Sequence, residues 1–137
     1  MSQTEPTELL AAVQAFLRQQ VLPQLEGFDA YTTRVAANSL SIVSRELRGR
    51  AAIEALDVAA GARWLPAGSA DDPARALSLA LRERSLTPDA DLLAYLRERT
   101  LRQMAIDNPR YSGFRLGCER WPELAAAASL SAPEANQ

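Results

Sequence analysis

The stretch RVAANSLSIVSREL, residues 34–47, indicates the fold class of the chain. Its apolar side chains recur at three- and four-residue steps, the spacing that places side chains on one face of an α-helix. That face consists of Ala36, Leu40, Val43 and Leu47, with Val35 and Ile42 on its flank. The pattern predicts a helix over residues 29–48 that buries this face and ends at Gly49.

The same periodicity continues on both sides of this helix. A preceding helix carries the apolar stripe Leu9, Leu10, Val13, Phe16, Leu17 and Val21, with a cap at Thr4 or Thr7 and an end near Pro23. Three further helices are expected: over 50–64, from Asp71 or Asp72 with Pro73 in the first turn, and from Thr87-Pro88 to Asn108. Residues 110–121 are predicted to be irregular because they contain two glycines. We therefore expect an all-α, single-domain bundle of four to five helices over residues 1–122, with an irregular C-terminal loop and a flexible tail over 123–137.

Composition excludes several classes of chemistry. The 137-residue chain has no histidine, no lysine and one cysteine, Cys118. Ser-His-Asp and Cys-His catalysis, histidine metal sites and lysine Schiff bases are therefore excluded within this chain. The net charge of −2 argues against nucleic-acid binding. We expect no cofactor and no metal, and we expect Cys118 to be inert, although Arg115 and Arg120 lie near it in the sequence.

The sequence also predicts where in the cell the protein is found. No apolar stretch approaches the roughly 20 residues that a membrane-spanning helix needs. The first residues, MSQTEP, lack the basic and apolar blocks of a signal peptide. We expect a cytoplasmic protein.

A polar face on the helix over 29–48 is the first candidate site. Arg34, Asn38, Ser41 and Arg45 fall within roughly 60° of one another at about 100° per residue, and Tyr31 lies beside them. Three interpretations stay open: a solvated surface, arginines that pin a loop, or an anion clamp for carboxylate or phosphate.

The segment AIDNPRYSGF, residues 105–114, is the second candidate site. Its candidate ligand or interface residues are Asp107, Asn108, Arg110 and Tyr111. A folded-back loop that Tyr111 anchors is the alternative to a binding role. Asp107 is also a candidate partner for Arg34 or Arg45, and a weaker hypothesis makes Asp107 or Tyr111 an acid or base in catalysis.

Residues 34–47 and 105–114 together resemble a family of small, uncharacterised bacterial proteins, a domain of unknown function, and residues 8–18 resemble its first helix. Members of this family are typically encoded beside an aminoglycoside-phosphotransferase-like kinase and an acyl-CoA dehydrogenase. The resemblance implies a cytoplasmic accessory role near acyl-CoA metabolism and assigns no catalytic residues.

Two functions follow as hypotheses. The first is a non-catalytic accessory protein that binds the phosphotransferase-like kinase or the acyl-CoA dehydrogenase, and it predicts an exposed apolar or arginine-rimmed patch. The alternative is a small-ligand module whose arginine face binds a CoA phosphate or an acyl carboxylate. Assembly of the chain into a homo-oligomer is left open.

Overall fold

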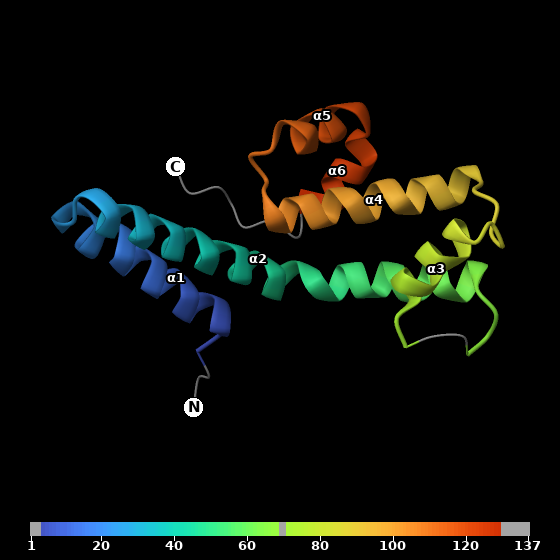
Figure 1. Ribbon diagram of the computed structural model, residues 1–137, viewed down its shortest axis with the longest axis horizontal. Helices are drawn as coiled ribbons and strands as arrows, with labels where there is room; N and C mark the ends of the chain where they lie inside the picture. Colours follow the sequence, from blue (N-terminus) through green and yellow to red (C-terminus); the bar gives the residue numbers. More distant parts are fainter. Residues whose placement is uncertain (1–3, 69–70, 130–137) are drawn as a thin grey trace. The chain divides into compact units, whose positions relative to one another are not determined.

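The computed structural model describes residues 4–68 and 71–129, and these residues form six α-helices and no β-strand (Figure 1). The α-helices are α1 (Pro6–Phe16), α2 (Gly27–Trp64), α3 (Pro73–Arg82), α4 (Ala90–Asp107), α5 (Ser112–Arg120) and α6 (Pro122–Ser129). A π-helical turn, η1 (Leu17–Val21), and a 3-10 turn, η2 (Leu22–Gln24), join α1 to α2. The all-α expectation is therefore confirmed, whereas the expected count of four to five helices is low.

Two compact units make up the chain, Met1–Arg48 and Gly49–Gln137. In the first unit, α1 and the first part of α2 form a helical hairpin (Figure 1). Its turn contains Pro23, which lacks the N–H that an α-helical bond to residue 19 needs, and Gly27, whose φ of +58° favours glycine. The expected cap at Thr4 or Thr7 is wrong: Glu5 precedes the helix, makes no side-chain cap, and Pro6 opens the first turn.

The expectation that Gly49 ends a helix is also wrong, because α2 continues through it to Trp64. A glycine inside a helix costs about 1 kcal/mol relative to alanine but, unlike proline, leaves the hydrogen-bond ladder intact. Gly49 is also buried within this helix. The two helices expected over 29–48 and 50–64 are thus a single helix of 38 residues.

The buried side of α2 in the first unit differs from the expected one. Ala30, Ala37 and Ser44 are buried, whereas Val43 and Leu47 of the expected core face are exposed. Apolar periodicity identifies the most apolar side of a helix, but it does not identify the neighbour that packs on it. Here α2 turns its small residues toward α1 and leaves its larger apolar residues uncovered.

The second unit packs the rest of α2 with α3 to α6. Its central cluster consists of Ala60, Leu77, Leu92 and Tyr95, and half-buried leucines and Trp64 surround it. Side-chain caps begin two of its helices, as Arg75 N–H donates to Asp72 at 3.1 Å and Leu92 N–H donates to Asp89 at 2.7 Å. The expected start signal at Asp72 and the expected stop before Pro109 are confirmed. The expected start at Thr87-Pro88 is wrong, because Asp89 caps α4 and the helix begins at Ala90.

The expectation that residues 110–121 are irregular is wrong, since most of them form α5. Both glycines of this helix lie where another side chain leaves no room. A Cβ on Gly117 would lie 2.7 Å from the Leu101 side chain of α4, and a Cβ on Gly113 would lie 2.5 Å from the Tyr111 ring. These glycines therefore serve close packing, which outweighs their low helix propensity.

The division into a domain over 1–122 and a flexible tail over 123–137 stays a prediction. Residues 122–129 form α6, which packs against α4 and α5 and buries Ala128. The remainder of the expected tail, residues 130–137, lies outside the described residues.

Candidate functional site

The residues expected at a site fall into two groups. Tyr31, Arg34, Asn38 and Arg45 all lie on α2 in the first unit. Asp107, Asn108, Arg110 and Tyr111 lie at the end of α4 and in the turn to α5, in the second unit. The suggested pairing of Asp107 with Arg34 or Arg45 stays a prediction, because its partners belong to different units.

Asn38 is part of the link between the two arms of the hairpin. The Arg18 guanidinium donates to Asn38 Oδ1 at 3.0 Å and to Ser41 Oγ at 3.5 Å. Ser41 Oγ in turn donates to Gln14 Oε1 at 2.9 Å. The arginine that reaches this polar face is thus Arg18, which the sequence reading did not single out, and it ties the turn after α1 to α2.

An exposed apolar stripe runs along α2 beside this polar face. We call it the Tyr31 stripe, and it consists of Phe28, Tyr31, Val35 and Ile42, which lie within about 60° of one another around the helix. Phe28 is 76% exposed and its ring lies 6.4 Å from that of Tyr31. Arg34, which is exposed, and Arg45 border the stripe on the side of Asn38. The first unit therefore presents an apolar surface with guanidinium groups along its edge.

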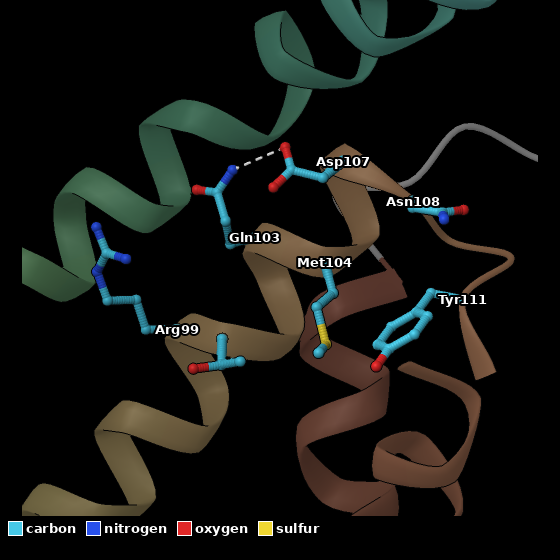
Figure 2. Close-up of a pocket in the computed structure, with 7 residues that line it drawn as sticks. Arg99, Gln103, Met104, Asp107, Asn108 and Tyr111 are labelled. Carbon is cyan, nitrogen blue, oxygen red and sulfur yellow. Dashed lines mark hydrogen bonds between the residues drawn. The ribbon is translucent and has the colours of Figure 1, made fainter. Parts of the chain in front are cut away.

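Three residues of the second group, all except Arg110, line an open pocket of about 330 Å³ (Figure 2). Asp107, Asn108 and Tyr111 belong to its lining, together with Arg99, Thr100, Gln103 and Met104 of α4. Figure 2 shows Met104 and the Tyr111 ring close together, with Gln103 and Asp107 meeting at another part of the rim. Gln103 Nε2 donates to Asp107 Oδ1 at 3.1 Å, and Arg50 donates to Gln103 Oε1 at 3.4 Å.

The turn after α4 is built by local hydrogen bonds. Asn108 Oδ1 accepts from the Arg110 N–H at 3.3 Å, and the Asn108 carbonyl accepts from the Tyr111 N–H at 3.0 Å. Tyr111 then precedes the first residue of α5, and its ring covers Gly113. Asn108 and Tyr111 thus shape the connection between α4 and α5.

A buried polar network in the second unit escaped the sequence reading. The Asp57 carboxylate accepts from Tyr95 Oη at 2.7 Å, from Arg99 Nε at 2.7 Å and from Arg99 Nη2 at 3.1 Å. Burial, together with the hydrogen bond to Asp57, raises the pKa of the Tyr95 hydroxyl far above its usual range. The bond to Asp57 also raises the pKa of the Arg99 guanidinium. Because the Arg99 guanidinium is paired with the Asp57 carboxylate, its positive charge is already balanced at the place where Arg99 lines the pocket.

Sequence signals for this network do exist. Asp57 lies within the apolar register that contains Ile53 and Ala60, and a carboxylate in such a register requires a buried donor. Tyr95 and Arg99 stand four residues apart on a later helix and so share a face. Which helix packs on which is not visible in the sequence, so the pairing is a finding of the structure.

Cys118 lies on α5, where burial and the nearby Glu119 raise the pKa of its thiol. The neighbouring arginines in the sequence therefore do not lower it. Among residues 4–68 and 71–129, no three histidine, cysteine, aspartate or glutamate side chains come together as a metal site. No helix within those same ranges is both long and apolar enough to cross a membrane.

The fold and these contacts define a class of small all-helical protein whose polar groups hold its helices together and whose first unit leaves apolar side chains uncovered. The chain belongs to the family described as Domain of unknown function (DUF6285), whose sequence model matches residues 23–111, more than half of the chain. A search of the curated proteins finds no match, and neither does a search of the solved structures. The matched region includes residues 34–47 and most of 105–114, but not the first helix.

Proposed function

We propose that this protein is a non-catalytic accessory protein that binds an enzyme, a phosphotransferase-like kinase or an acyl-CoA dehydrogenase, through the Tyr31 stripe. The observation that carries the proposal is the exposure of this stripe beside Arg34. Contiguous apolar surface with a polar rim is typical of protein–protein contact sites. Tyrosine, phenylalanine and arginine are the side chains enriched in such interfaces.

The expected chemistry of the partner follows from the stripe. Phe28 and Tyr31 supply large, rigid side chains that fill apolar pockets, and Val35 and Ile42 extend the contact along the same helix face. An amphipathic helix of this kind binds in an apolar groove. Arg34 at the edge favours a groove that carries carboxylates on one rim.

The polar groups of the chain support a role without catalysis. Asp57, Tyr95 and Arg99 satisfy one another, and Asn38 accepts from Arg18. The Cys118 thiol has a raised pKa, which disfavours the nucleophilic thiolate. The identity of the partner rests on the family resemblance, since members of this family are typically encoded beside the two enzymes. A cytoplasmic location belongs to the same proposal.

The experiment is a pull-down with the tagged chain from the cells that naturally produce it, with every retained protein identified. Wild type is compared with Ile42→Glu and with Val43→Glu. These neighbouring residues are both β-branched and similarly exposed, at 41% and 47%, but only Ile42 belongs to the Tyr31 stripe. We expect wild type and Val43→Glu to retain one of the two enzymes in stoichiometric amount, and Ile42→Glu to lose it. Retention of neither enzyme by wild type would refute the proposal.

The small-ligand alternative, with Arg34, Asn38 and Arg45 as an anion clamp, stays a prediction. The Asn38 amide oxygen is engaged by Arg18, and no further contact of the described residues favours a bound anion at this place. We therefore propose only the first function, an accessory protein that binds an enzyme.

A further inference from the structure

A second uncovered apolar surface lies on the hairpin of the first unit. In α1, Leu9, Val13 and Phe16 are each about half exposed, although they belong to the most apolar stripe of that helix. In α2, Val43 and Leu47 are exposed to a similar degree. The sequence pattern marks these residues as core, and the described part of the chain leaves them uncovered.

Helix geometry places the two sets on the same side of the hairpin. Gln14 contacts Ser41 and Arg18 contacts Asn38, so residue numbers fall along α2 as they rise along α1 and the helices run antiparallel. At about 100° per residue, the exposed set on each helix lies roughly a third of a turn from the contact with the other helix, rotated in the same sense. In an antiparallel pair of helices, side chains that are rotated in the same sense about each helix axis, away from the contact, lie on the same side of the pair.

The register matches these residues in pairs. The pairing of Gln14 with Ser41 and of Arg18 with Asn38 sets Leu9 level with Leu47, Val13 level with Val43 and Phe16 level with Leu40. These six residues form one continuous surface, which we call the Val43 face. It is distinct from the Tyr31 stripe, which lies on the other side of α2.

The first unit lacks a core of large side chains. Within its described residues, the buried positions are Ala30, Ala37 and Ser44. Two helices in contact through such small residues bury little apolar area, and helical hairpins of this length gain most of their stability from a further packed layer. The Val43 face is the surface on which that layer would pack.

We propose that the Val43 face binds the same face of a second copy of this chain, so that two hairpins form a four-helix bundle. The face suits a self-complementary contact because residues 9–17 and 35–44 contain no charged side chain. A partner that is itself uncharged and apolar matches it, and a second copy supplies such a face at equal concentration. The inference does not depend on the enzyme partner, because it uses another surface.

The area is of the right order for a dimer. Five large side chains that are each about half exposed present on the order of 500 Å² per copy. A stable interface buries about 800 Å² per partner. The remaining area per copy comes from Leu40, Ala36 and the neighbouring residues of α1 and α2, when both helices pack along their whole length.

The test is the mass of the full-length chain in solution, measured by sedimentation equilibrium from about 1 to 100 μM. We expect wild type to reach twice the chain mass of 14.9 kDa. Val43→Glu and, on the other helix, Val13→Glu each place two carboxylates in the interface and should weaken the dimer by at least about a hundredfold. The matched control Ile42→Glu should dimerise as wild type does.

Helix content by circular dichroism keeps the result unambiguous, because a monomeric variant counts only if it remains folded. Wild type that stays at the mass of one chain throughout would overturn the proposal, and so would Val43→Glu that dimerises as well as Ile42→Glu. A wild-type chain that is monomeric yet binds the enzyme through the Val43 face would also overturn it. A wild-type chain that forms the dimer but binds neither enzyme would instead count against the function proposed above and would leave the dimer standing.

Discussion

Replacing Asp57 by alanine removes the acceptor of three hydrogen bonds in the second unit, from Tyr95 Oη and from two nitrogens of Arg99. Tyr95 is 8% exposed, so its hydroxyl group cannot turn to water, and an unsatisfied buried donor costs about 1–3 kcal/mol. The Arg99 side chain is 30% exposed and regains some hydration, so its share is reduced to about 1 kcal/mol. We therefore expect Asp57→Ala to lower the free energy of unfolding by about 3 kcal/mol, toward the lower end for a broken buried ion pair.

The assay is urea denaturation at pH 7, followed by circular dichroism, for Asp57→Ala, Tyr95→Phe and the double variant. Once the hydroxyl is gone, part of the cost of losing Asp57 disappears with it. The double variant should therefore be more stable than the sum of the single effects predicts, with a coupling of about 1 kcal/mol or more. A loss below about 0.5 kcal/mol for Asp57→Ala, or strictly additive single effects, would refute the description of a buried coupled network.

Three further predictions concern the second unit. Because the pKa of Tyr95 is raised in the folded chain, its hydroxyl group keeps its proton at a pH where the unfolded chain loses it. The free energy of unfolding should therefore fall as pH rises above about 10. Urea denaturation at increasing pH should show a shallower fall for Tyr95→Phe than for wild type. Gly61→Ala would place a Cβ 2.8 Å from the rigid ring of Pro73, so we expect a net loss of about 1 kcal/mol in urea denaturation despite the better helix propensity; equal or greater stability would show that α3 moves freely away from α2. Cys118 should react with an aromatic disulfide reagent at pH 8 more slowly in the folded chain than in urea, because burial raises the thiol pKa, and equal rates followed by absorbance would contradict this.

Much of the fold was predictable because its signals are local. The cap at Asp72 and the stop at Pro109 depend on a few neighbouring residues, and the structure contains both. The two misjudged glycine regions are different. Gly49 and Gly117 read as helix breakers, but each occupies a buried position in a helix, and burial depends on residues distant in the sequence.

The site was less accessible to prediction. Asn38 lies on the polar face of α2, yet it accepts a hydrogen bond from Arg18, which lies twenty residues away in the sequence. The Asp57 network joins residues that are 38 and 42 positions apart. Periodicity assigns each helix an apolar side, but whether that side meets the same chain or another one depends on packing. The Val43 face illustrates this, since its pattern indicates a core and the described part of the chain leaves it exposed.

The central claim is that the chain binds an enzyme through the Tyr31 stripe. Its most direct test is isothermal titration calorimetry of the purified full-length chain against the purified kinase-like enzyme and the purified dehydrogenase. We predict stoichiometric binding to one of them at micromolar concentration, loss of that binding in Ile42→Glu, and its retention in Val43→Glu. Absence of heat with both enzymes, or equal binding by Ile42→Glu and wild type, would contradict the claim.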